Sequence, residues 1–160
     1  MATNKVKIRL QGHEKFALRE GWINKGLMLI PKDPGIFLKP DAPDAFGIGS
    51  NMVKSLRYWM RVLGLTVERG SAGVSLSPLG TLIEKYDPYI ENPYTLWLMH
   101  SCIAKNKAEA TSWYMYFNRC DANDLDKNQI YSILWREINQ YVAGQKFSDK
   151  SLSSDIDVLY

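Results

Sequence analysis

A glycine-rich break between two short helical segments constrains the fold of this chain more than any other feature. Residues 41–46 can form one or two helical turns, residues 47–49 (Gly-Ile-Gly) supply a tight turn, and residues 51–63 form an amphipathic helix. Ser50 is a favourable N-cap for that helix and Gly64 is a favourable stop. This segment predicts a helix-turn-helix.

The spacing after the turn agrees with that prediction. A helix-turn-helix needs a glycine that accepts positive φ, a small apolar residue after it, and buried residues at fixed later positions. Gly47 and Ile48 fill the first two positions, and Val53 and Leu56 follow six and nine residues after Gly47. One position departs from the pattern, because Pro43 stands where alanine is preferred. Pro43 therefore predicts a short first helix.

A hairpin is expected after the second helix. Residues 65–68 and 74–77 are short strand candidates, and the link over residues 69–73 contains two glycines. Ser77-Pro78 then restarts a helix that runs to about Tyr86. The order helix, turn, helix, hairpin, helix predicts a winged helix-turn-helix domain over residues 1–86.

The rest of the chain is expected to be mostly helical. Val6, Ile8 and Leu10 alternate with charged residues, which predicts a short strand, and residues 14–29 predict a helix. Further helices are expected over residues 92–104, 108–118 and 124–142, and from residue 151 onward. The fold class is therefore mainly α, with a small helical domain over residues 87–160. The helical ending at Tyr160 predicts that this domain is cut short at its C-terminus.

The placement of charge favours nucleic acid at one end of the chain. The 160 residues carry a net charge of +3. There are eight basic and three acidic residues in 1–40, five and four in 41–86, and seven and ten in 87–160. The N-terminal half therefore suits a phosphate backbone better than the C-terminal half does.

The sequence carries no export or membrane signal. No run approaches the ~18 uninterrupted apolar residues that predict a membrane span. The charged N-terminus has no apolar block behind it. Two cysteines, Cys102 and Cys120, give no disulfide framework. We therefore expect a cytoplasmic protein with reduced thiols and no membrane partner.

The helix over residues 51–63 carries the candidate DNA contacts. One side is apolar, and the other is basic and contains no carboxylate. Arginine pairs bidentately with guanine, asparagine reads adenine, and lysine or tyrosine holds phosphates. The tip of the hairpin is expected to touch an adjacent phosphate or the minor groove. The predicted nucleic-acid-binding residues are Ser50, Asn51, Lys54, Arg57, Tyr58, Arg61, Arg69 and Ser71.

Signals for catalysis are weaker. His13-Glu14 and Arg19-Glu20 contain acid, base and metal-ligating side chains. A metal-dependent nuclease needs several carboxylates that converge on one cation, and no second cluster has a suitable spacing. Gly12-His13-Glu14 is better explained as a junction at the start of a helix. We therefore predict no enzyme activity and no cofactor.

Two other groups of residues have structural explanations. His100, Cys102 and Cys120 lack the paired spacing of a zinc site, so no metal is expected. The aromatic segment over residues 108–118 has the composition of a base-stacking surface, but an aromatic core helix has the same composition.

A set of short motifs is spread over roughly residues 8–160: Gly12-His13-Glu14-Lys15-Phe16, Leu18-Arg19-Glu20-Gly21-Trp22, Gly49-Ser50-Asn51-Met52-Val53, Leu56-Arg57-Tyr58-Trp59, Thr95-Leu96-Trp97-Leu98, Ala110-Thr111-Ser112-Trp113-Tyr114 and Phe117-Asn118. Together they resemble an uncharacterised prokaryotic family that is described only as a domain of unknown function. Its genes tend to lie in mobile islands beside DNA phosphorothioation-type and phosphoadenosine-phosphosulfate-reductase-like genes linked to phage defence.

The resemblance implies a bacterial protein that acts beside DNA modification or phage defence, and a family of longer chains. It assigns no catalytic residues. The motif residues whose role it leaves open are Gly12, His13, Glu14, Arg19, Glu20 and Trp22.

These observations predict a DNA-binding winged-helix protein of a bacterial DNA-modification or phage-defence system, with double-stranded DNA as its partner. The alternative is an adaptor that docks onto a partner enzyme of the same system through the winged helix or the aromatic C-terminal half. A nuclease that uses His13, Glu14 and Glu20 is a third hypothesis. A homodimer and other proteins of the same operon are compatible with either of the first two hypotheses.

Overall fold

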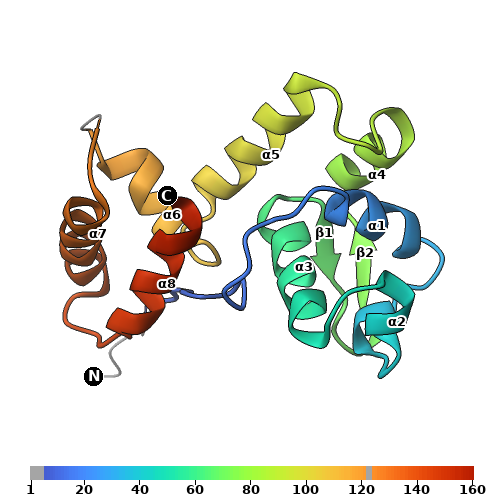
Figure 1. Cartoon of the computed structure of the whole chain (residues 1–160), viewed down its shortest axis with the longest axis horizontal. Coiled ribbons are helices and arrows are strands. Elements are labelled where there is room, and N and C mark those ends of the chain that lie inside the picture. The colour runs from blue at the N-terminus through green and yellow to red at the C-terminus, as the bar shows by residue number, and fades with distance from the viewer. Residues whose placement is uncertain (1–5, 122–123) are drawn as a thin grey trace. The chain divides into compact units, whose positions relative to one another are not determined.

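The fold is mainly helical, as the sequence predicts, with one small antiparallel hairpin (Figure 1). The computed structural model describes residues 6–121 and 124–160. In that part of the chain, no helix has the length and apolar character needed to cross a bilayer. The chain forms two compact units, Phe16–Cys102 on the one hand, and the chain up to Lys15 together with Ile103–Tyr160 on the other. The sequence predicted a single division after residue 86, so both boundaries differ from that expectation.

The unit Phe16–Cys102 contains the helix-hairpin-helix order that the sequence predicts. Helix α1 packs against α3 and α4, and α2 packs against α3. Its largest fully buried side chains include Leu27, Ile30, Phe46, Leu56 and Met60. The elements are α1 (Trp22–Leu29), a 3₁₀ turn (Ile36–Leu38), α2 (Ala42–Phe46), α3 (Ser50–Val62), β1 (Thr66–Glu68), a second 3₁₀ turn (Gly70–Ala72), β2 (Val74–Leu76), α4 (Pro78–Tyr86) and the greater part of α5 (Pro93–Lys105).

Glycines set both ends of α3. Gly47 adopts the left-handed conformation with φ 63°, and the amide of Ile48 donates to the carbonyl of Pro43 at 3.1 Å, which closes the turn after α2. Gly49, rather than the predicted Ser50, is the extended N-cap of α3. At the other end, Gly64 has φ 77°, a conformation that favours glycine because it has no Cβ.

The hairpin after α3 is pinned by a close backbone approach. Strands β1 and β2 pair with Thr66 opposite Leu76 and Glu68 opposite Val74. The amide of Val74 donates to the carbonyl of Pro34 at 2.9 Å. Gly73 has φ 88°, and a Cβ built on it would lie 2.0 Å from the Pro34 carbonyl oxygen. Only glycine fits at this position without moving the backbone of the 33–35 loop.

The second unit is a helical cluster. It contains α6 (Thr111–Arg119), α7 (Lys127–Val142) and α8 (Asp149–Leu159). A capping box at Asp126 starts α7, and the Ser148 hydroxyl caps α8. The buried core residues of this unit are Met115, Ile130, Leu134, Ile138, Val142, Leu152 and Ile156.

The strand predicted at Val6–Leu10 is wrong. Among residues 6–121 and 124–160 the segment has no strand partner, and side chains of the helical cluster bind its backbone instead. The amide of Arg9 donates to the Thr111 hydroxyl at 3.0 Å, and the Gln145 amide group donates to the Val6 carbonyl at 3.3 Å. These hydrogen bonds satisfy backbone groups that a neighbouring strand would otherwise pair with.

The helix predicted over residues 14–29 begins only at Trp22. Glu14 and Lys15 have positive φ values of 51° and 67°, and Gly21 has φ 76°. A right-handed helix needs negative φ, so the chain cannot continue a helix through these residues.

His13 belongs to a buried polar network and not to an exposed junction. Its Nε2 donates to Asp155 Oδ1 at 2.9 Å, and the Ser112 hydroxyl donates to Asp155 Oδ2 at 2.5 Å. The amide of Gln11 also donates to Asp155 Oδ1, at 2.7 Å. These hydrogen bonds hold the N-terminal segment against α6 and α8. Because the side chains of His13, Ser112 and Asp155 are fully buried, Ser112 is not accessible to a substrate as a nucleophile.

We expect the substitution His13→Ala to lower the free energy of unfolding by about 3–5 kcal/mol, because it leaves the buried Asp155 carboxyl without one of its donors. His13→Phe should also destabilise the chain, although the phenyl ring keeps the edge contact that His13 makes with Trp113. Urea unfolding measures both values. Glu14→Ala, at the exposed neighbouring position, is the control and should change stability little. A His13→Phe chain as stable as the original would contradict a role for the hydrogen bond.

We expect Gly73→Ala to destabilise the chain by more than the ~1–3 kcal/mol of backbone strain alone, since the new methyl group also meets the Pro34 carbonyl. Gly144→Ala is the matched control. Gly144 has φ 87° but nothing lies near its Cβ position, so strain alone applies there, at about 1–2 kcal/mol. Equal losses of stability for the two variants would show that the close approach to Pro34 is unimportant.

Candidate nucleic-acid interface

The first turn of α3 is the exposed polar surface that the sequence predicted. Ser50, Asn51 and Lys54 are all exposed. The Lys54 ammonium lies 3.4 Å from Asn51 Oδ1, a long hydrogen bond, so both groups remain accessible to a ligand. These residues lie at the N-terminal end of the helix, where recognition helices place their base contacts.

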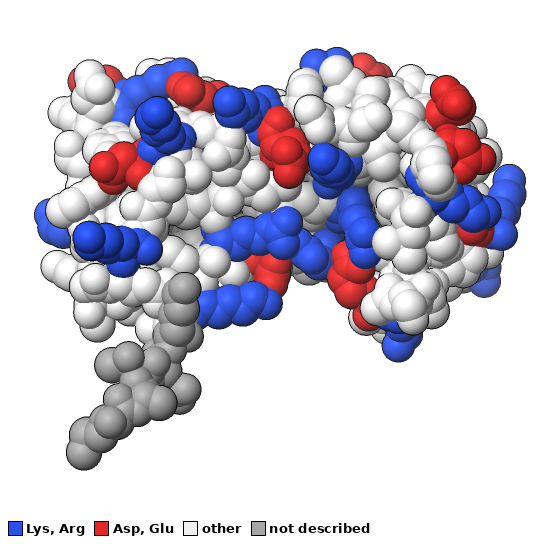
Figure 2. Space-filling view, turned by 90° about the horizontal axis from the view of Figure 1, so that it is seen from below, with Lys and Arg blue, Asp and Glu red and all other residues white. Residues whose placement is uncertain are grey.

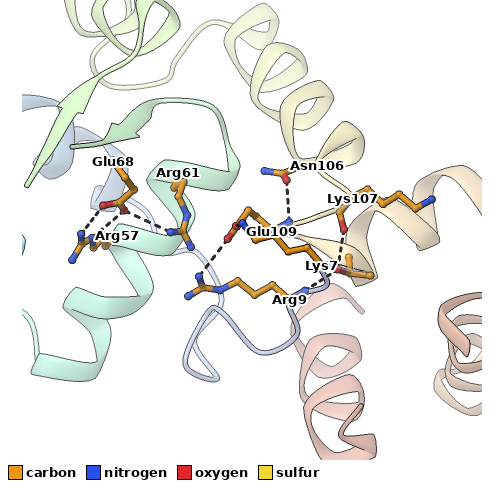
Figure 3. A network of polar contacts seen from close by, with 9 residues as sticks. Lys7, Arg9, Arg57, Arg61, Glu68, Asn106, Lys107 and Glu109 are labelled. Carbon is orange, nitrogen blue, oxygen red and sulfur yellow. Dashed lines mark hydrogen bonds and ion pairs between the residues drawn. The ribbon is translucent and has the colours of Figure 1, made fainter. Parts of the chain in front are cut away.

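Further along α3, the predicted basic face meets a carboxylate from the hairpin (Figure 3). Arg57 donates to both oxygens of Glu68, from Nε to Oε1 at 3.1 Å and from Nη2 to Oε2 at 2.6 Å. Arg61 Nη1 lies 3.7 Å from Oε1 of the same carboxylate. The predicted face of the helix contains no carboxylate of its own, but β1 brings Glu68 against Arg57 and Arg61, so these two arginines are not unpaired.

Tyr58 is not on the outward face. Its side chain is only 2% exposed, and its ring packs edge-on against Trp59 at 5.5 Å between centroids. The segment before α1 also contacts α3, since the Trp59 indole donates to the Phe16 carbonyl at 3.0 Å and the Ser55 hydroxyl donates to the same oxygen at 3.3 Å. Burial therefore extends over more of α3 than one apolar stripe.

The hairpin tip presents the other predicted contacts. Arg69 and Ser71 are exposed, on the link that contains the Gly70–Ala72 turn. Arg69 Nε donates to the Ser75 hydroxyl at 3.0 Å, which leaves its terminal nitrogens available at the surface. Lys54 and Arg69 are thus the predicted cations that the Glu68 carboxylate does not engage.

Opposite charges balance across this unit. Residues 16–102 contain nine Lys or Arg and eight Asp or Glu, and Figure 2 shows the two signs interspersed on the face drawn. Lys39 pairs with Asp33 at 2.5 Å, and this hydrogen bond raises the pKa of Lys39. Lys25 donates to the Phe46 carbonyl at the end of α2, at 2.8 Å. Any attraction for DNA therefore depends on local placement of charge more than on net charge.

The N-terminal cations bind within the other unit. Lys7 and Arg9 both pair with Glu109, Arg9 from Nη1 at 3.3 Å (Figure 3). The carboxylate itself is half-buried. The sequence analysis included Lys7 and Arg9 in the basic N-terminal half. In the structure the Glu109 carboxylate, just before α6, partly neutralises both charges.

The motif residues of open role are divided between the two units. His13 is buried and Glu14 is exposed in one unit, whereas Arg19, Glu20 and Trp22 belong to the other. The Arg19 guanidinium lies 5.8 Å from the ring centroids of both Phe16 and Trp22, as in a cation–π contact. Gly12 is buried beside His13.

The described residues contain no group of three or more His, Cys, Asp and Glu side chains that could hold a metal ion. His100 packs edge-on against Trp97 on α5, and Cys120 follows α6. Burial raises the pKa of the Cys120 thiol, which disfavours the thiolate that binds metals. On α6, Trp113 is buried while Phe117 is exposed, so the aromatic segment is largely core.

The family model described as "Protein of unknown function (DUF4007)" matches residues 10–160. This chain belongs to the DUF4007 family. The expectation of an uncharacterised family is thereby confirmed, while the genomic neighbourhood that the resemblance implied stays a prediction. No relative among curated proteins matches the chain.

Two crystal structures are similar to the DUF4007 chain over nearly all of its length. The magnesium ion-bound SspB structure has a TM-score of 0.83 and 28% sequence identity, and the other SspB structure has a TM-score of 0.82 and 27% identity. Each match covers 97% of this chain and 49% of the SspB chain. The DUF4007 chain therefore spans about half the length of the SspB chains that it matches.

The structure reveals two polar contacts that sequence reasoning missed, one at the candidate interface and one in the helical cluster. Glu68 was assigned only to a strand, although an acidic residue next to the predicted wing was visible in the sequence. Asp155 was not singled out at all, and no local signal connects it to His13, 142 residues earlier. Both side chains act through contacts between elements, which sequence periodicity does not report.

We expect Glu68→Gln to loosen the hairpin while changing the global free energy of unfolding by only about 0–1 kcal/mol, since all three side chains of the ion pair are partly exposed. Hydrogen exchange measured by NMR should then be faster for the amides of β1 and β2. Glu84→Gln on the exposed side of α4 is the control. Unchanged exchange in the hairpin of the Glu68→Gln variant would contradict a clamping role.

Proposed function

We propose that the unit Phe16–Cys102 is a winged helix-turn-helix that binds double-stranded DNA, with the N-terminal end of α3 in the major groove and the hairpin as the wing. One observation carries the proposal. The Arg57–Glu68–Arg61 ion pair fixes the hairpin against α3, while the polar first turn of α3 and the hairpin tip stay exposed. A rigid helix and an attached basic loop are the two parts that such a domain needs.

In this proposal the eight predicted residues have different roles. Asn51 reads a base edge, with adenine as its preferred partner, and Ser50 and Lys54 hold the flanking phosphates. Arg69 and Ser71 contact the backbone beside the wing. Arg57 and Arg61 act as positioning residues through Glu68, and Tyr58 supports the core of α3.

The biological setting belongs to the same proposal. The sequence motifs resemble those of a family whose genes tend to lie beside DNA phosphorothioation-type genes. This resemblance favours a cytoplasmic role in bacterial DNA modification or phage defence. A DNA-binding module suits such a system, because modification and defence both act on duplex DNA. The alternative role as an adaptor predicts binding to a partner enzyme and no affinity for duplex DNA at low salt.

A duplex-binding titration against salt concentration tests the proposal. A fluorescent duplex of random sequence is titrated with the chain between about 50 and 200 mM salt, where electrostatic binding changes most. Lys54→Ala and Arg69→Ala should each weaken binding and reduce the salt slope by about 1, as expected for one lost phosphate contact. Lys146→Ala, at an exposed position in the other unit, is the control. Wild-type affinity and slope in both variants would reject the proposed interface.

The Glu68→Gln variant adds a second test with the opposite sign. Removing the carboxylate charge releases Arg57 from its bidentate ion pair, so affinity at low salt and the salt slope should both rise. If instead the rigid wing matters more than the extra charge, the variant should bind more weakly. An unchanged affinity would show that neither the charge nor the clamp is near the DNA.

A further inference from the structure

The backbone of the segment Val6–Leu10 meets the helices along one of its two edges. In an extended chain the N–H and C=O of one residue point to the same side, and this side alternates from each residue to the next. The amide of Arg9 donates to Thr111 at the start of α6. The amide of Gln11, two residues later, donates to Asp155 of α8. The odd-numbered residues therefore present their backbone to the helices, and the even-numbered residues present theirs to the opposite side.

The opposite edge of this segment is largely unpaired. At its start, the Val6 carbonyl accepts from the Gln145 amide group at 3.3 Å. No residue in the described part of the chain pairs with the amide or the carbonyl of Ile8, and the same holds for Leu10. Ile8 and Leu10 therefore each offer one donor and one acceptor along this edge. An unpaired edge of extended chain is a template for another strand.

A groove of about 470 Å³ runs beside this edge. Ile8, Leu10 and Phe147 contribute apolar side chains to its lining, and all three also pack on the core of the helical cluster. The loop between α7 and α8 forms the other wall, and the Gln145 side chain bridges the two walls at Val6. The unpaired backbone groups and an open groove therefore occur at the same place.

The charge of the groove indicates the chemistry of its occupant. Its lining includes the exposed side chains of Lys7 and Lys146, and it includes no Asp or Glu. Glu109 offsets the charge of Lys7, whereas no described carboxylate pairs with Lys146. Asp149 follows Lys146 in the sequence but lies outside the lining, and its Oδ1 accepts from the Trp135 indole at 3.2 Å. The groove therefore complements a negatively charged polypeptide.

The two faces of an added strand meet different surroundings. Residues that lie opposite each other in neighbouring strands have side chains on the same face. A residue opposite Ile8 therefore points toward the apolar lining. Its neighbours along the strand point to the other face, on the side of the exposed Lys7 ammonium. The groove thus favours a segment in which aliphatic and acidic residues alternate.

We propose that this groove binds an extended segment of a partner protein, in which acidic and aliphatic residues alternate, as a strand that pairs with Ile8 and Leu10. The aliphatic side chains of the partner pack beside Phe147, and its carboxylates lie near Lys7 and Lys146. Val6–Leu10 then becomes the strand that its alternating sequence predicts. This docking is independent of the proposed DNA interface, which belongs to the other unit.

Amide hydrogen exchange measured by NMR on the whole chain tests the proposal. The probe is a synthetic peptide of about eight residues, slightly longer than an average strand, in which glutamate and valine alternate. Without peptide, the amides of Ile8 and Leu10 should exchange fast and those of Arg9 and Gln11 slowly. The peptide should slow exchange severalfold at Ile8 and Leu10 and leave the other two amides unchanged. Unchanged exchange at Ile8 and Leu10 in the presence of millimolar peptide would overturn the proposal.

Two N-methylated forms of the peptide show whether its backbone is responsible for binding. Only one edge of an added strand faces Ile8. N-methylation of one alternate set of peptide amides should therefore abolish binding, and N-methylation of the other set should preserve it. Binding of both forms, or of neither, would contradict strand pairing.

A pair of variants tests the contribution of charge. Lys146→Glu should weaken binding of the glutamate–valine peptide severalfold, because it reverses the charge of the groove. Lys105→Glu is the matched control, at an exposed position of the same unit outside the lining, and should leave the affinity unchanged. Equal affinities of the two variants would refute an acidic occupant.

Two further outcomes would assign the edge to a different occupant. Exchange at Ile8 and Leu10 that slows as the protein concentration rises, without peptide, would show pairing with a second copy of the chain. The same protection caused by a DNA duplex would show that the groove binds nucleic acid. Either result would overturn the proposal.

Discussion

The carboxylate of Glu68 ties helix α3 to the hairpin that follows it, two elements that also pack against each other. Short two-stranded hairpins are marginal on their own, so this one depends on what it packs against. Arg57 and Arg61 hold it from one side, and the Pro34 carbonyl holds it from the other through Val74. The same carboxylate offsets part of the charge of two guanidinium groups that remain partly exposed, so the hairpin is held in place at the expense of net positive charge on this face.

The order of elements in the unit Phe16–Cys102 could be predicted because its signals are local. Gly47 and Gly64 adopt positive φ, Ser77-Pro78 starts α4 with a side-chain cap, and each feature is visible within a few residues. The prediction of which α3 side chains are exposed was less successful. Helical spacing alone predicted that Tyr58 faces outward, whereas its side chain is buried. A helical wheel gives the direction in which each side chain points from the helix axis. Whether a side chain in that direction is buried depends on segments that are distant in the sequence.

The N-terminal segment shows the same limit for strands. The alternation of Val6, Ile8 and Leu10 predicted a strand, and although the segment forms none, Ile8 and Leu10 pack on the helical core. The alternation could not tell whether strands or side chains would satisfy the backbone. Here Thr111, Gln145 and Asp155 do so, and Asp155 is itself supplied with donors by Ser112 and His13. Every partner lies more than 100 residues away, beyond the reach of any local pattern.

The helical cluster is assembled from both ends of the chain, with Phe16–Cys102 inserted between them. On the ribosome, the segment before Phe16 emerges ahead of the inserted unit, but its partners Thr111, Gln145 and Asp155 are translated only after that unit. The inserted unit can fold during synthesis, because all of its chain has already appeared by then. Until then the N-terminal peptide, including His13, has to wait as a nascent extended segment, exposed to chaperones and proteases.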